Sequence, residues 1–303
     1  MHKKGCADMT ELPKARYRPG SSRFLRFLSY VLLIITSVLI LLPIVLTFLY
    51  SFFPVKEMTG YLKLRNNYSN EQWMDILLSP SIVSLRQYYS LMIEKPIYLK
   101  LFVNSAIYTV SVIIGQALII PALAYSLSCF RFRGRDTLFF GVLMLMLLPF
   151  QVTMAPSVLI MRTLGLMDTI WAIILPMLVS PFYVFLVRQY MVTIPRDMLE
   201  AGLMDGAGTI RTFFHIVLPI SKPILGAACA LSFADTWNLV EQPLIYLSNS
   251  RDLMPLSVMF NALSTEEAGV AFAGAALYIL PALLLYTYFQ EDILLGIQLS
   301  DMK

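Results

Sequence analysis

Charged residues are scarce in this chain of 303 residues. Asp, Glu, Lys and Arg together make up 14% of it, whereas hydrophobic residues make up 58%. Soluble domains carry about a quarter charged residues, so this composition is typical of a chain that lies in a lipid bilayer. The basic residues flank apolar runs and form no stripe, which argues against a nucleic-acid partner.

Cysteine and histidine are also rare. Cys6, Cys129 and Cys229 form an odd, unclustered set, and His2 and His215 are far apart in the sequence. Such a set provides neither a disulfide framework nor metal-ligand spacing, and it supplies no catalytic group. The phosphate-binding pattern G-x-x-x-x-G-K-[ST] is missing as well. The sequence therefore predicts no enzyme and no ATP-binding chain, and we expect no cofactor or metal in it.

Six apolar stretches are long enough to cross a bilayer, for which a helix needs about 20 residues. They lie at 27–53, 101–128, 137–161, 169–190, 223–246 and 270–290. The first is too long for a signal-peptide core and lacks a small-residue cleavage site, so we interpret it as a retained span. The sequence predicts an all-α, multi-pass membrane protein with six transmembrane helices.

The orientation of these spans follows from the 23 Lys and Arg residues. An N-terminus inside the cell places most of them, including the short run Arg131–Arg135, on the cytoplasmic side, as the positive-inside rule requires. We therefore expect a cytoplasmic tail at 1–26, an external segment at 54–98, a core of five helices at 101–290 and a second cytoplasmic tail at 291–303. Prolines interrupt several spans, which favours a transporter over a passive anchor.

The cytoplasmic loop at 191–222 is more than a polar connector. Pro195 can begin a helix, and Asp197 and Glu200 suit the positive end of that helix. Apolar residues recur between them at helical spacing until Gly206 ends the pattern. We predict a helix-turn-helix that projects into the cytoplasm and needs a partner for its apolar face. From these residue types alone, an amphipathic helix lying on the membrane surface is the open alternative.

This loop resembles the EAA loop of permease subunits in binding-protein-dependent ATP-binding-cassette (ABC) importers, whose pattern is E-A-A, then G, then I-x-L-P. The chain departs from it at Gly202, where the family usually has Ala, and Gly costs about 1 kcal/mol in a helix interior. The resemblance implies that the loop docks on a separate ATPase and transmits its closure to the spans. The implied coupling residues are Glu200, Ala201, Gly202, Asp205, Gly206, Ile216, Leu218 and Pro219.

Further likeness runs over nearly the whole chain and points to the maltose-type sugar importers. It rests on 101–105, 124–127, 130–135, 148–151, 164–169 and 237–238. The resemblance implies a prokaryotic plasma membrane, a second and different permease subunit, an ATPase dimer that binds ATP and Mg, and an external solute-binding protein. It implies a carbohydrate solute but does not name it, so neutral sugars, polyols, glycerol phosphate and sugar acids all stay open.

A polar cluster interrupts the predicted fifth span. Asp235, Asn238 and Gln242 are spaced to share one face of a helix, beside Trp237. Polar groups inside a bilayer usually face the bundle interior or a water-filled path. We expect these four residues to line the translocation path. Hydrogen bonding between helices, without solute contact, is the alternative.

The same residues leave other functions open. A permease of the same superfamily for amino acids, oligopeptides or metals is one alternative, against which the turn at 130–135 and the Trp237-Asn238 pair favour the sugar branch. A membrane-embedded enzyme would need convergent acid, base or metal ligands, and the sequence offers only the cluster in the fifth span. A self-sufficient secondary transporter is disfavoured because the chain shows no internal repeat.

Overall fold

The computed structural model describes residues 23–66, 79–259 and 268–301. Within these ranges the regular elements are all helices, which confirms the predicted all-helical fold. Four helices are long and apolar enough to cross a membrane, and the number rises to six when each of two sharply bent pairs counts as one span.

The longer helices follow the predicted spans. They are α1 (Arg23–Tyr50), α4 (Pro96–Cys129), α5 (Arg135–Leu147), α6 (Phe150–Thr163), α8 (Pro181–Val192), α12 (Lys222–Trp237) and α15 (Ala268–Asp301). Shorter helices connect them: α2 (Val55–Asn66), α3 (Arg86–Tyr89), α7 (Trp171–Met177), α9 (Arg196–Met204), α10 (Thr209–Thr212), α11 (Leu218–Ile220), α13 (Glu241–Tyr246) and α14 (Leu256–Met259). Two π-helical turns, η1 (Ser90–Glu94) and η2 (Phe213–Val217), and one 3₁₀ turn, η3 (Arg251–Leu253), complete the described elements.

The chain divides into two compact units, one ending at Thr47 and the other beginning at Phe48. The first unit contains most of α1, whose apolar side chains are largely exposed, as in Leu32 (64%) and Leu39 (68%). Exposed apolar side chains on a helix of this length suit lipid as the surrounding solvent.

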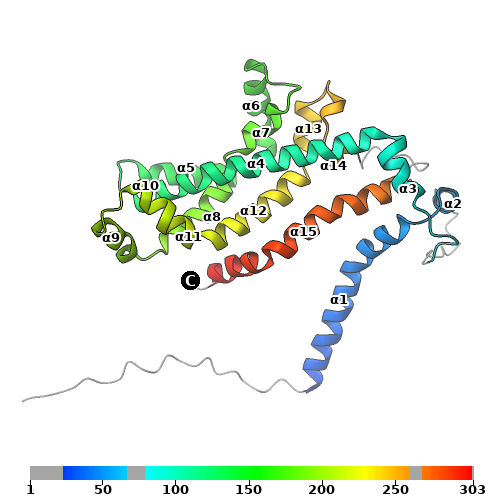
Figure 1. The fold of residues 1–303 in the computed structure, drawn as a ribbon, viewed down its shortest axis with the longest axis horizontal. Coiled ribbons are helices and arrows are strands. Elements are labelled where there is room, and N and C mark those ends of the chain that lie inside the picture. The colour runs from blue at the N-terminus through cyan, green and yellow to red at the C-terminus, as the bar shows by residue number, and fades with distance from the viewer. Residues whose placement is uncertain (1–22, 67–78, 260–267, 302–303) are drawn as a thin grey trace, which may run out of the picture. The chain divides into compact units, whose positions relative to one another are not determined.

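The second unit is built around α4 and α12. Helix α4 packs against α8 and α12, and α12 packs against α15, so that these helices lie side by side in Figure 1. The buried residues of α12 include Gly226, Ala227, Ala228 and Ala230. Small residues let helix backbones approach closely in membranes, which places α12 at the centre of the second unit.

The third predicted span is sharply bent. Helices α5 and α6 meet at an angle of 105° within the span predicted at 137–161. The break falls at Leu148, which is extended (φ −70°, ψ 129°), and Pro149. A residue before proline disfavours the helical conformation, because the proline ring crowds its backbone. This span is therefore a bent pair of helices.

The fifth predicted span also ends early. Helix α12 stops at Trp237, and the chain resumes helical structure only at Glu241, the first residue of α13. Pro243 explains the gap, since in an uninterrupted helix its ring would clash with the carbonyl of Leu239 and it has no N–H to donate. The sequence had suggested that Asp235, Asn238 and Gln242 share one face of a helix. Because the helix is interrupted, they do not lie on one continuous helix.

Candidate functional site

The segment at 191–222, which was predicted to be cytoplasmic, consists of two helices joined by a tight turn. Helix α9 ends at Met204, and the turn after it contains Gly206, whose φ of +77° lies in the left-handed region that favours glycine. The N–H of Ala207 donates to the carbonyl of Gly202 at 3.0 Å, and the N–H of Asp205 donates to that of Ala201 at 3.0 Å. These bonds satisfy the last carbonyls of α9 and close the helix.

The two halves of the motif touch each other through Gly202. A Cβ atom placed on Gly202 would lie 2.6 Å from Cδ1 of Ile216, which is closer than real Cβ atoms approach. Gly202 is buried, and Val217, next to Ile216, is fully buried. The glycine at this position therefore makes room for Ile216, so that α9 rests on the π-helical turn η2 instead of standing free of it.

The exposed surface of this segment combines acidic residues with apolar side chains. Glu200, Ala201 and Asp205 are exposed, whereas Leu218 is partly buried and Pro219 is exposed. The exposed apolar side chains on α9, α10 and η2 are Met198, Met204 (88%), Ile210 (74%) and Phe214. Apolar side chains gathered on a protruding segment mark a surface for contact with a partner.

A polar cavity of about 440 Å³ lies between α4, α6, α7, α8, α12 and α13. This volume is within the usual range of small-molecule sites. The polar side chains that line it are Gln116, Thr153, Ser157, Ser180, Tyr183, Ser232, Asp235, Thr236, Gln242 and Tyr246. The bend between α5 and α6 and the early end of α12 bring α6 and α13 to this cavity.

Hydrogen bonds between helices fix part of the cavity wall. The hydroxyl of Tyr183 on α8 donates to Oδ2 of Asp235 on α12 at 2.5 Å. Gln116 on α4 donates from Nε2 to the carbonyl of Met177 at 2.7 Å and accepts from the hydroxyl of Ser232 at 2.6 Å. The wall is thus held by contacts among three helices and the end of α7.

The α6–α13 side of the cavity has one satisfied pair and one unsatisfied group. The hydroxyl of Tyr246 donates to Oγ of Ser157 at 2.8 Å. Oε1 of Gln242 is buried and has no hydrogen-bond partner among the described residues. Buried polar atoms are nearly always hydrogen-bonded, so this enclosed amide oxygen is an exception.

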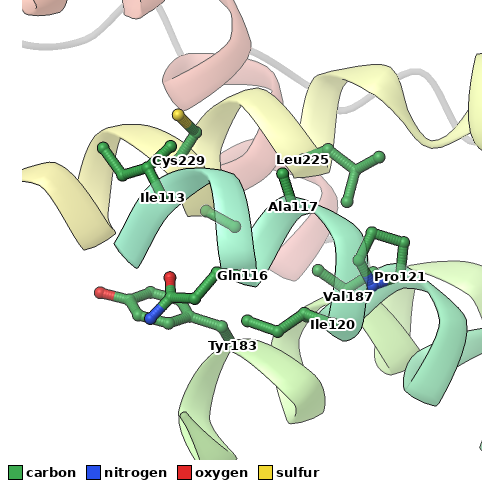
Figure 2. A pocket seen from close by; sticks show the side chains of 10 residues that line it. Ile113, Gln116, Ala117, Ile120, Pro121, Tyr183, Val187, Leu225 and Cys229 are labelled. Atoms are coloured by element: carbon green, nitrogen blue, oxygen red, sulfur yellow. The ribbon is translucent and has the colours of Figure 1, made fainter. Parts of the chain in front are cut away.

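A second, apolar pocket of about 70 Å³ adjoins the same wall. Figure 2 shows Gln116 and Tyr183 together at one end of it, with Ile120, Pro121 and Leu225 toward the other. Gln116 and Tyr183 line both spaces. The smaller pocket offers little room and few polar groups, so the larger cavity is the candidate solute site.

The four residues predicted to line a path have different surroundings. Asp235 and Gln242 line the polar cavity. Trp237 is buried, stacks on the ring of Tyr278 and donates from Nε1 to the carbonyl of that residue at 3.1 Å. Asn238 is exposed and donates to a carbonyl in the last turn of α12. Path lining by any of the four stays a prediction.

Sequence reasoning did not single out most of the polar wall. Gln116, Ser157, Tyr183, Ser232 and Tyr246 sit on spans where no motif marks them. The one available signal was Gln116, a lone amide within a long apolar run, because an amide at membrane depth requires a partner.

These features define a class of protein. It is a multi-pass helical membrane protein with a polar cavity between bent helices and a helical segment that exposes apolar side chains. Residues 117–291 match the family described as "binding-protein-dependent transport system inner membrane component". The chain belongs to this family. It is a permease subunit of an ABC importer in the bacterial inner membrane, it is not itself catalytic, and its family implies an ATPase and a binding protein as partners.

Similar proteins serve carbohydrate-related uptake systems. The arabinooligosaccharides transport system permease protein AraQ of Bacillus subtilis is 30% identical over 233 residues, which cover 76% of this chain and 83% of AraQ. The diacetylchitobiose uptake system permease protein NgcG of Streptomyces coelicolor is 27% identical, with 92% and 89% covered. The sn-glycerol-3-phosphate transport system permease protein UgpE of Yersinia enterocolitica is 33% identical, with 51% and 55% covered.

A solved structure has the same fold. It is that of a bacterial ABC transporter involved in the import of the acidic polysaccharide alginate. One of its chains superposes with a TM-score of 0.76 at 25% identity, covering 90% of this chain and 99% of the other.

Proposed function

We propose that this chain forms half of the translocation path of a carbohydrate importer and is coupled to its ATPase through the segment at 191–222. The observation that carries this proposal is the contact between Gly202 and Ile216. It joins α9 to η2, and η2 leads through α11 directly into α12. A push on α9 would therefore be passed to the helix that carries Asp235.

The polar cavity supports a carbohydrate as the solute. Its wall offers hydroxyl, amide and carboxylate groups beside Tyr183 and Tyr246. Sugars present many hydroxyl groups, which need hydrogen-bond partners when they leave water. AraQ and NgcG belong to systems named for oligosaccharides, and this supports the same solute class here.

The exposure of Asp235 supports a second permease subunit. This carboxylate is exposed in the single chain, although it lies on a helix of a candidate membrane span. A charge facing lipid at this depth is unfavourable, whereas a charge facing a water-filled path between subunits is common. We propose that a second, different permease covers this side.

The basic residues support an orientation with both termini in the cytoplasm. Arg131, Arg133 and Arg135, in the turn between α4 and α5, line one surface hollow together with Arg196 at the start of α9. The most basic loop and the proposed coupling segment therefore lie on one side of the protein. Positive loops remain cytoplasmic, and the ATPase works on that side.

A charge reversal at Glu200 tests the coupling. In proteoliposomes that contain the whole assembly and its binding protein, Glu200→Lys should lower solute-stimulated ATP hydrolysis about tenfold or more, because it places a repulsive charge at the docking surface. Immunoblotting of membranes should show normal amounts of the subunit.

The matched control is Asp252→Asn, which removes another exposed acid, paired at 3.1 Å with Lys100, outside this segment. It should leave stimulated hydrolysis at the level of the unmodified protein. Undiminished hydrolysis in Glu200→Lys would contradict the docking role.

A further inference from the structure

The cavity wall has one charged side chain, and it is acidic. Among the described residues that line the 440 Å³ space, Asp235 is the only Asp, Glu, Lys or Arg. Arg188, the cation on α8, does not line the cavity, and its guanidinium carbon lies 4.0 Å from the ring centroid of Phe139. The fixed charge of the cavity is therefore a single negative one.

The solutes named for similar proteins fall into two groups, uncharged and anionic. The names of AraQ and NgcG refer to arabinooligosaccharides and diacetylchitobiose, which carry no acidic group. The name of UgpE refers to sn-glycerol-3-phosphate, and the solved transporter imports acidic alginate. An anion entering the cavity of this chain would approach a carboxylate without a compensating cation in the described wall, and such repulsion is strong where water is scarce.

We propose that Asp235 forms a contact point for the hydroxyl groups of an uncharged sugar or polyol, and that its charge excludes anionic sugars from this half of the path. The inference rests on the proposed function and narrows its solute class. It also assigns direct solute contact to this subunit.

The hydrogen-bonding state of Asp235 supports this role. A carboxylate only accepts hydrogen bonds and has room for several of them. Tyr183 occupies Oδ2 of Asp235 and holds the group in place, which leaves Oδ1 for a solute. Asp235 is exposed and lines the cavity. Its free oxygen is an acceptor, which suits hydroxyl donors rather than phosphate or carboxylate oxygens.

Thiol labelling measures the charge selectivity of the cavity without knowledge of the solute. In the complete assembly, with Cys6, Cys129 and Cys229 replaced by Ala, Thr153→Cys places a thiol in the wall on α6. Its reaction rates with cationic methanethiosulfonate ethyltrimethylammonium and anionic methanethiosulfonate ethylsulfonate are compared. Thr163→Cys, an exposed position at the end of the same helix and outside the wall, is the matched control.

We expect the ratio of cationic to anionic labelling rates to be about tenfold higher at 153 than at 163, as expected for a nearby fixed charge. Asp235→Asn should return the ratio to the control value. Tyr183→Phe keeps the carboxylate of Asp235 and should retain the preference for the cationic reagent. This variant is the control for a folding defect in Asp235→Asn.

Equal ratios at the two positions, or a thiol at 153 that neither reagent reaches, would overturn the inference. Persistence of the preference in a correctly assembled Asp235→Asn protein would overturn it as well. None of these outcomes depends on ATP hydrolysis, so failure of the inference is distinguishable from failure of the proposed coupling.

Discussion

Two glycines in the proposed coupling segment differ in backbone conformation. Gly206 has a φ of +77°, whereas Gly208 has a φ of −68°. A Cβ atom at either position would meet nothing within 4 Å. Any difference between alanine substitutions at the two sites therefore reports conformation and not crowding.

We predict that Gly206→Ala strains the turn after α9 by about 1–2 kcal/mol, the usual cost of a left-handed alanine. Solute-stimulated ATP hydrolysis should fall several-fold, because the strain is relieved by moving α9 from its position on η2. Gly208→Ala should behave like the unmodified protein. Equal activities of the two variants in reconstituted assemblies would show that the left-handed turn is unimportant for coupling.

Residue patterns predicted part of this segment and missed part of it. Gly206 indicated a tight turn with positive φ, because the motif has glycine at this position and glycine adopts positive φ readily. The contact of Gly202 with Ile216 could not be predicted, since it joins residues on different helices. The sequence suggested a looser helix at Gly202, whereas the structure fills the same space with Ile216.

At the level of elements, Asp168 links the loop after α6 to the loop after α13. Its carboxylate accepts from the backbone N–H of Asn249 at 2.8 Å and from Nδ2 of that residue at 3.0 Å, and its own N–H donates to the carbonyl of Tyr246 at 2.9 Å. Hydrogen bonds from the side chain and then the backbone of Asn249 lower the pKa of the Asp168 carboxyl. The link helps to hold α13, and with it Gln242, beside α7.

This link should depend on pH. A carboxyl whose pKa is lowered by folding contributes stability above its ordinary pKa of about 3.9, and it loses that contribution as the pH falls through the lower value of the folded state. We predict that Asp168→Asn lowers the melting temperature at neutral pH but removes part of the decline below about pH 4. Asparagine tolerates the positive φ of 59° at this position.

Thermal unfolding of the purified assembly from about pH 3 to pH 7 measures the effect. Asp252→Asn, which breaks only an exposed pair with Lys100, should change the profile little. A pH profile of Asp168→Asn that parallels the unmodified protein would mean that the Asp168–Asn249 link does not stabilise this region.

The type of the elements was predictable from the sequence, but their boundaries were not always predictable. Hydropathy located the membrane helices, because a bilayer requires long apolar runs. It could not show the 105° bend between α5 and α6, because both arms are apolar. Pro149 and Pro243 carried the missing information, yet prolines also occur inside unbroken helices here, as Pro121 does in α4.

At the scale of the whole molecule, the polar cavity arises from contacts between distant parts of the chain. Tyr183 and Asp235 are 52 positions apart, and Gln116 and Ser232 are 116 positions apart. Local spacing carries no signal for such pairs, so the sequence indicated Asp235 without its partner. Trp237, predicted to line the path, packs against aromatic rings from α12 and α15, and its local sequence did not indicate these contacts.

We propose that this subunit works only within a larger assembly. The most direct test is gentle purification of the tagged chain from its native membrane, followed by mass spectrometry of the proteins that accompany it. We predict a P-loop ATPase and a second, different permease in stable association, with the ATPase lost from the Glu200→Lys variant. A chain that is recovered alone and stable, without an ATPase even in the mildest detergent, would contradict the account.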